Sequence, residues 1–567
     1  MPEVAFDRFY RYDELTEILQ GWAEERPELY RLESIGKSYE GRDIWLVTLT
    51  NFETGPDPEK PAFLIEANIH AIEVTGATAA LHLIARVLSG YGEDERVTRV
   101  LDTRVFYVVP RLSPDGAELA LADRPRFVRS STRPWPLLDE QDGLFEEDMD
   151  GDGRILMARI PDPNGSWKPH EDDPRMMVRR DAVDEGGTYY RVLWEGRIRN
   201  FDGVTIKVAP PLEGLDLNRN FPMEWAVEGE QRGAGPYPTS EPEIRAMVQA
   251  IVDRPNITGH IAYHTFSGVH LRPYGGYPDD HYPTNDLRTY QLIGEEATKI
   301  TGYPAISVFH DFKYHPKQTI KGSAHDWLYD HLGVISWTTE FWSPQRRAGI
   351  EEYQYIEWLR DHPAEDDLKL LRWSDEQLDG KGYVDWYPFE HEQLGQVELG
   401  GWDLMSCWAN VPPQFLEEEI APHTELAIWH LLISPRLEIR SPDVESLGAD
   451  SWLVRLVVEN TGWLPTSVSE KAVERKAVRE LEAEILLPDG AKVIGGERKT
   501  TLGQLDGRVH RRSLIWWDSD DATSDRAKVE WVVEAPGGAA VTVEARHQRA
   551  GTVRRELTLQ GAEATTK

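Results

Sequence analysis

Three apolar runs of strand length in the first 112 residues are the strongest constraint on how this chain can fold. They are IWLVTLT at 44–50, AFLIEAN at 62–68 and VFYVVPRL at 105–112. Runs of this kind are typical of strands that are buried on both faces. Between the second and third runs, Leu81, Ile84 and Leu88 recur at the spacing of one helix face. The alternation predicts an α/β fold with a mixed or mostly parallel sheet covered by helices on both sides.

This pattern breaks off and later resumes. From about 135 to 211, Asp, Gly and Pro crowd together, which predicts an insertion built largely of loops. Beyond the insertion we expect a helix at 240–253, a strand at 257–268, a helix followed by a strand within 325–342, and a closing helix near 415–433. We therefore expect one α/β domain over residues 5–435 that contains the insertion at about 135–211.

The sequence after the α/β domain has a different pattern of apolar residues. After residue 435, strand-like runs ended by turn residues follow one another, which predicts a β-sandwich over residues 436–562. The expected strands lie within 452–465, 480–490, 513–520, 528–538, 541–551 and 553–561. A chain of 567 residues is too long for a single ordinary core, in keeping with two or three domains.

Charge and composition exclude several classes of protein. With 62 basic and 98 acidic residues, the formal charge is −36, which disfavours binding to nucleic acid or to anionic membranes. Cys407 is the one cysteine, so neither an intrachain disulfide nor a cysteine zinc site can form. The N-terminal residues lack the basic and apolar regions of a secretory signal, and no apolar run reaches ~18 residues. We expect a cytoplasmic protein.

The stretch EANIHAIEVTG at 66–76 places His70 and Glu73 three residues apart. A hydrolytic zinc site takes three His, Asp or Glu ligands and keeps one position open for water. His264 is the best candidate for the third ligand, because the predicted strand GHIAYHT ends there in a loop of small residues. Each residue also has a simpler interpretation: Glu73 suits a helix N-terminus, and a lone histidine is usually a satisfied core residue.

Two further motifs add polar groups. GLDLNRNFP at 214–222 contains Asp216, Asn218 and Arg219, and an adjacent Asn and Arg can clamp a carboxylate. ISWTTEFWS at 335–343 places Glu340 at the end of an apolar strand, where a carboxylate is costly unless it is paired or used.

Together these pieces resemble the zinc carboxypeptidases of the carboxypeptidase A type. The resemblance covers about 7–430 and rests on seven motifs that occur in the family's order. They are IGKSYEGRDIW, IHAIE, PRLSPDG, DLNRN, SEPEI, HTFSGVHLRPYG and TEF. The resemblance implies a mixed eight-stranded sheet flanked by helices, and one Zn²⁺ per chain.

The resemblance also implies roles for residues. His70, Glu73 and His264 match the zinc ligands, and Glu340 matches the general base. Arg129 in FVRSSTR matches the residue that polarises the scissile carbonyl, with Arg126 and Arg133 as alternative matches.

The resemblance assigns the DLNRN motif as well. Asn218 and Arg219 match the clamp for the substrate's C-terminal carboxylate, and Asp216 matches the acceptor that orients His70.

The sequence departs from the family in one loop. Enzymes of this type carry a mobile tyrosine before the last catalytic strand, whereas here Lys321 or Gln318 falls near that position and Tyr314 is the remaining candidate. His325 stands where the family often sets its preference for a side chain, which leaves that preference open.

The resulting hypothesis is a zinc metallocarboxypeptidase that acts on peptides with a free C-terminal carboxylate. One alternative is a zinc amidase or deacylase acting on N-acylated amino acids or cell-wall peptides. A second alternative is an inactive scaffold that binds a partner through its sandwich, although such a protein would be expected to lose Glu340 or a zinc ligand.

A second cation site is also possible. DMDGDGRI spaces Asp148, Asp150 and Asp152 two residues apart around glycines, as calcium loops do. A complete EF-hand needs Glu at the twelfth position, where this chain has Arg159. We expect a structural calcium loop closed by a distant acid; the simpler interpretation is a solvated acidic turn.

Overall fold

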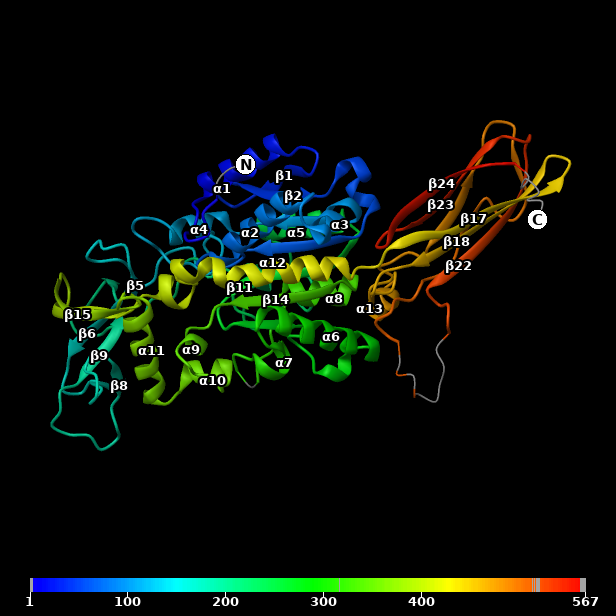
Figure 1. The fold of residues 1–567 in the computed structure, drawn as a ribbon. Coiled ribbons are helices and arrows are strands. Elements are labelled where there is room, and N and C mark those ends of the chain that lie inside the picture. The colour runs from blue at the N-terminus through cyan, green and yellow to red at the C-terminus, as the bar shows by residue number, and fades with distance from the viewer. Residues whose placement is uncertain (1–3, 316, 512, 514, 516–520, 561–567) are drawn as a thin grey trace.

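The computed structural model describes residues 4–315, 317–511, 513, 515 and 521–560. Its central element is a mixed eight-stranded sheet, as the resemblance to the zinc carboxypeptidases implies (Figure 1). In spatial order the strands are β1 (Tyr30–Lys37), β2 (Asp43–Leu49), β4 (Val105–Val109), β3 (Ala62–Ala67), β11 (Ile257–Thr265), β14 (Ile335–Phe341), β12 (Val269–Arg272) and β13 (Ala305–Ser307). The middle of the sheet, β4 to β14, is parallel. Strand β1 was not among the strands predicted from the sequence.

Helices cover both faces of this sheet. Helices α2 (Thr75–Gly90) and α12 (Leu416–Leu432) pack together on the face that carries Tyr263 and Phe341. Helix α8 (Ala324–Leu332) covers the opposite face, where His325 meets Thr338. Strands β3, β11 and β14 are buried over their whole length, which explains their near-continuous apolar sequences.

Small residues let α2 approach the sheet closely. A Cβ on Gly76 would lie 2.9 Å from both the Cβ and the carbonyl oxygen of Tyr263. Thr75 and Ala77 beside it are fully buried. The first turn of α2 is therefore seated against β11, and the residues just before it are held at the end of the sheet.

The insertion forms a sheet rather than loops alone, which corrects the sequence-based expectation. Six short strands lie in it: β5 (Gly143–Glu146), β6 (Met157–Pro161), β7 (Trp167–Pro169), β8 (Met177–Arg179), β9 (Tyr190–Trp194) and β10 (Gly196–Arg199). Strand β6 pairs with β16 (Gly395–Trp402), and β16 with β15 (Tyr383–His391), so one six-stranded sheet joins segments more than 200 residues apart. Strands of three to five residues are too short to show a period in the sequence.

The C-terminal part is a sandwich of two antiparallel four-stranded sheets, as predicted. One sheet contains β17 (Leu437–Gly448), β18 (Ser451–Asn460), β22 (Arg526–Glu534) and β20 (Lys492–Gly495). The other contains β21 (Lys499–Thr501), β19 (Glu482–Leu486), β23 (Ala540–His547) and β24 (Gly551–Thr558). The strand expected at 513–520 falls mostly outside the described residues.

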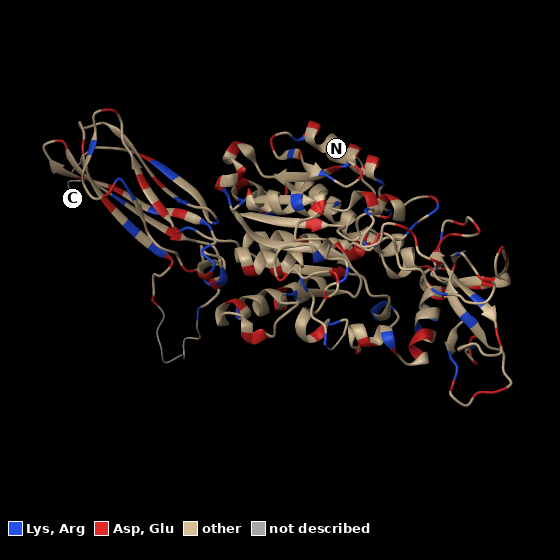
Figure 2. Cartoon of the chain, turned by 180° about the vertical axis from the view of Figure 1, so that it is seen from behind, with Lys and Arg blue, Asp and Glu red and all other residues tan. Residues whose placement is uncertain are grey.

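The sandwich and the insertion sheet lie at opposite ends of the α/β unit (Figure 1). Arg549 of the sandwich links it to the α/β unit. Its guanidinium donates hydrogen bonds to the carbonyl oxygen of Gly333, at the end of α8, and to that of Ser467 in the C-terminal part. Acidic and basic side chains are distributed along all three parts of the chain (Figure 2). Among the described helices, none combines the length and apolar character that a membrane crossing requires.

Candidate metal centre

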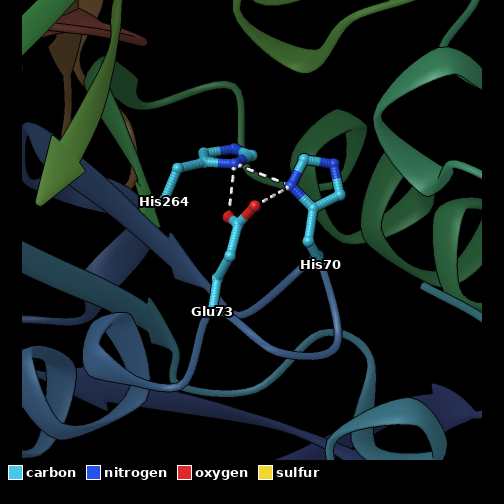
Figure 3. A group of neighbouring side chains, drawn as sticks. All are labelled: His70, Glu73 and His264. Carbon is cyan, nitrogen blue, oxygen red and sulfur yellow. Dashed lines mark hydrogen bonds and ion pairs between the residues drawn. The ribbon is translucent and has the colours of Figure 1, made fainter. Parts of the chain in front are cut away.

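The candidate ligands lie where two neighbouring strands end. His70 and Glu73 stand in the turn between β3 and α2, and His264 stands near the end of β11 (Figure 3). Asn68 begins the turn with a positive φ of 57°, and its amide donates to the carbonyl oxygen of His70 at 2.7 Å. Arg111 in turn donates to the Asn68 amide oxygen at 3.0 Å. The backbone that carries His70 is therefore fixed by buried hydrogen bonds.

The three side chains converge on one point. The Nδ1 atoms of His70 and His264 lie 3.1 Å apart, and each lies close to a Glu73 oxygen, at 2.8 Å from Oε1 and 3.0 Å from Oε2 respectively. Tetrahedral zinc with bonds of about 2.0–2.2 Å spaces its ligand atoms about 3.3–3.6 Å apart, so small movements suffice to admit the ion. Two buried imidazoles that direct lone-pair nitrogens at each other and at a carboxylate form the donor set of a zinc site. The residues present therefore fit the metal.

Asp216 determines how the His70 ring is turned. Its Oδ1 lies 3.1 Å from His70 Nε2, so a proton on Nε2 leaves Nδ1 free as a ligand. Burial would raise the pKa of Asp216, but Arg219, Arg129 and His70 hold it well below its usual value. Nε2 of His264 is buried and has no hydrogen-bond partner among the described residues.

Arg129 is the arginine that reaches the centre. Its guanidinium donates to Asp216 Oδ2 and to Glu73 Oε1, each at 3.1 Å. The alternative matches are used elsewhere, because Arg126 pairs with Glu213 and Arg133 pairs with Glu241.

Glu340 stands beside the ligands without a fixed partner. The residue is 8% exposed, and its carboxylate receives no hydrogen bond from the described residues. Burial and the charge of Glu73 raise its pKa well above the usual value, while Arg129 and Arg219 oppose the shift. A buried carboxylate with a raised pKa is suited to accept a proton and to return it.

The DLNRN motif lies on the rim of the same cleft. Asp216 caps a short 3₁₀ helix, Leu217–Arg219, by accepting from the Asn218 backbone N–H at 2.9 Å. The Asn218 amide oxygen accepts from Ala324 N at 2.9 Å, which turns the NH₂ group away from α8. Asn218 and Arg219 both line the cleft and leave donors for an anion.

The cleft has a volume of about 170 Å³ and an apolar inner wall. His325 lines it, with its Nδ1 hydrogen-bonded to the Thr338 hydroxyl at 3.2 Å, and burial lowers the pKa of His325 to about 3. The apolar wall was not anticipated from the sequence. It comprises Leu271, Val308, Phe312, Ile320, Ile356 and Leu359.

Tyr314 also lines the cleft, although its side chain is 46% exposed. Burial of its hydroxyl raises the pKa of Tyr314, while the positive charges of Arg129 and Arg219 oppose the rise. Lys321 instead lies 3.4 Å from Glu230.

The acidic loop is arranged differently from the expected calcium loop. Asp148 and Asp150 place carboxylate oxygens within 4.8 Å of each other and of Glu195. Asp152 pairs with Arg154 instead. Glu195 directly precedes β10 and lies 45 residues after Asp150 in the sequence. No local pattern in the sequence identifies it.

Comparison with known proteins agrees with this geometry. A family model described as zinc carboxypeptidase matches residues 15–357, more than half of the chain. The chain belongs to the zinc carboxypeptidase family. A second model, described as a domain of unknown function, matches residues 436–558.

Individual relatives of the zinc carboxypeptidase family are distant. The chain is 31% identical over 114 residues to a zinc carboxypeptidase of Saccharothrix mutabilis subsp. capreolus, covering 20% of this chain and 26% of that protein. It is 23% identical over 335 residues to carboxypeptidase A2 of Rattus norvegicus, covering 58% and 61%. The matches thus span less than two thirds of the length of these relatives.

Solved structures also align with this chain, at low identity. Thrombin activatable fibrinolysis inhibitor aligns with a TM-score of 0.43 at 16% identity, covering 75% of each chain. Carboxypeptidase A from Helicoverpa armigera aligns with a TM-score of 0.39 at 18% identity, covering 66% of this chain and 76% of that one.

Proposed function

We propose that this chain is a zinc-dependent carboxypeptidase that removes the C-terminal residue of peptides. The observation that carries the proposal is the placement of Glu340 and the Asn218–Arg219 pair in one cleft with the three ligands. Zinc bound by His70, Glu73 and His264 supplies Lewis acidity, which polarises a carbonyl and brings water close to deprotonation near neutral pH.

Side chains of this protein carry out the proton transfers and stabilise the developing charge. Glu340 takes the proton from the attacking water at its carboxylate and delivers it to the leaving amine. The Arg129 guanidinium turns from Glu73 toward the carbonyl oxygen and stabilises the charge that develops there. Its freedom to do so depends on Asp216, which holds the Nε side of the same guanidinium at 3.1 Å.

The clamp restricts the enzyme to the end of a chain. Arg219 presents a planar fork of donors, which matches a carboxylate and not an amide. The carboxylate bound there fixes the last peptide bond opposite Glu340, so internal bonds are not attacked. Tyr314 lines the same cleft as both guanidinium groups and covers the bound C-terminus.

The test compares a peptide with its C-terminal amide. We expect amidation to lower kcat/KM by about 100-fold or more, because it leaves Arg219 without its anion. Arg219→Met should lower kcat/KM for the free acid by a similar factor and leave the amide nearly unchanged. Equal cleavage of acid and amide by the unaltered enzyme would show that the clamp does not bind the C-terminus.

The calcium role of the acidic loop remains a separate proposal, with Asp148, Asp150 and Glu195 as its carboxylates. If Ca²⁺ binds there, millimolar Ca²⁺ should raise the Tm, and Asp148→Asn should abolish the rise. Mg²⁺ at the same concentration is the control. If the Tm does not change with Ca²⁺, the loop is an acidic turn that binds no calcium.

A further inference from the structure

A second and larger cavity adjoins the metal cleft. Its volume is about 840 Å³, against about 170 Å³ for the cleft, and it lies within the range of cavities that enclose whole ligands. Arg129 and Arg219 line both spaces, so they meet at the residues proposed to bind substrate. The clamp leaves room for a single residue beyond the scissile bond, so whatever enters the second cavity must belong to the upstream part of a substrate.

The walls of this cavity come from the insertion and are held in place by its backbone. Leu144 of β5 donates to the Lys207 carbonyl oxygen at 2.7 Å, and Ala209 donates back to Leu144 at 3.0 Å. Gly143 allows this approach, since a Cβ there would lie 2.7 Å from Ala209 N. Figure 1 shows β5 between the central sheet and the insertion sheet. The cavity is therefore part of the folded structure and does not depend on closure of a loop.

Most charged groups on the walls are already paired. Glu213 pairs with Arg126, Glu147 lies 3.3 Å from Arg197, and Asp148 accepts backbone N–H groups of the acidic loop.

Two guanidinium groups on the cavity walls have no ion-pair partner. Within the described part of the chain, Arg124 and Arg232 line the cavity without a carboxylate at ion-pair distance. Two lining carboxylates, Glu146 and Asp148, likewise have no cation at that distance, but Asp148 is 4% exposed and its oxygens accept backbone N–H groups, whereas both arginines are exposed. In a chain of net charge −36, two unpaired guanidinium groups beside a substrate cleft form a local attraction for anions.

We propose that this second cavity binds the segment of a peptide substrate that precedes the scissile bond, and that Arg124 and Arg232 favour carboxylate side chains in that segment. The inference rests on the carboxypeptidase function proposed above and adds a substrate class to it: extended acidic peptides rather than dipeptides or N-acylated amino acids. The apolar wall residues, Phe127 and Val208 among them, contact the aliphatic parts of the same segment.

Three substrates with the same last two residues test the proposal. They are an N-blocked dipeptide, a hexapeptide with Gln at two upstream positions, and the same hexapeptide with Glu there. We expect kcat/KM to rise from the dipeptide to the Gln hexapeptide, and to rise about fivefold more for the Glu hexapeptide, the size of an ion pair partly screened by water. The Glu advantage should shrink in 0.5 M salt, because the arginines are exposed.

The variant Arg124→Ala/Arg232→Ala should abolish the Glu advantage and leave the dipeptide rate unchanged. Arg555→Ala, an exposed arginine on the sandwich, is the matched control and should change none of the three rates. A Glu advantage that survives in the double variant, or a dipeptide cleaved as well as either hexapeptide, overturns the inference. A chain that cleaves none of the three substrates refutes the proposed function instead, so the two failures are distinguishable.

Discussion

His264 on β11 and Glu340 on β14 are direct partners in a parallel strand pair. A candidate zinc ligand and the proposed general base therefore stand one strand apart, about 4.8 Å between backbones, on the same face of the sheet. Their separation is set by the backbone ladder rather than by a flexible loop. This relationship allows the base to be altered without disturbing the ligands.

Glu340→Gln should abolish hydrolysis while zinc stays bound. Glutamine keeps the size of the side chain but cannot accept the proton of the attacking water, so kcat should fall by about 10²–10⁴-fold. Zinc content by mass spectrometry and turnover of a good peptide are the measurements. His70→Ala is the comparison, since it should lose both zinc and activity. Normal turnover by the glutamine variant would remove Glu340 from the mechanism.

Asp216→Asn should weaken zinc binding about 10- to 100-fold, because the hydrogen bond that orients His70 is altered. A zinc competition titration measures the change in Kd. Asp123→Asn, at an exposed position, is the control and should leave the Kd unaltered. Unchanged zinc affinity in Asp216→Asn would mean that the His70 ring is held by other contacts.

Gly76→Ala should destabilise the protein by about 1–3 kcal/mol, because the new Cβ would overlap Tyr263 at 2.9 Å. The free energy of unfolding in denaturant measures this cost. Gly229→Ala is the matched control, since a Cβ on Gly229 meets nothing within 4 Å. If both variants unfold alike, α2 is free to shift away from β11.

Glu66 should make stability fall as pH rises from about 4.5 to 8. Burial raises the pKa of Glu66 to about 8, and its carboxyl faces His260, whose pKa burial lowers to about 3. Between the unfolded pKa and the folded pKa, the folded state holds a proton that the unfolded state has lost. The stabilisation is therefore complete below about 4.5 and declines by up to about 1.4 kcal/mol per pH unit up to about 8.

Glu66→Gln should remove this dependence, because an amide is neutral at every pH in the window. Urea unfolding at pH 5, 6 and 7 gives the slopes, with Glu24→Gln on the exposed side of the first helix as control. An equal slope in the unaltered chain and in Glu66→Gln would mean that the Glu66 carboxyl is ionised when folded.

Much of the centre could be predicted because its residues lie in short motifs. His70 and Glu73 share one turn, Asp216 to Arg219 share one 3₁₀ helix, and the apolar strands around His264 and Glu340 are recognisable by composition. Each strand carries its ligand to the same edge of a parallel sheet, so the order of motifs along the chain is enough to predict that they meet.

Other features depended on contacts that no local pattern records. The pairing of β6 with β16 and the approach of Glu195 to Asp148 join segments far apart in the sequence, and short strands carry no period that would indicate their partners. The choice of Arg129 over Arg126 was likewise decided by which carboxylates lay nearby.

The sequence by itself determined the α/β sheet, the sandwich and the types of side chain available for zinc. These follow from hydrophobic burial and from ligand chemistry, which act residue by residue. The tertiary structure alone decided that the insertion walls a second cavity and that Arg124 and Arg232 face it unpaired. Whether a charge is free or paired depends on distances in space, because Coulomb attraction acts through space and not along the chain.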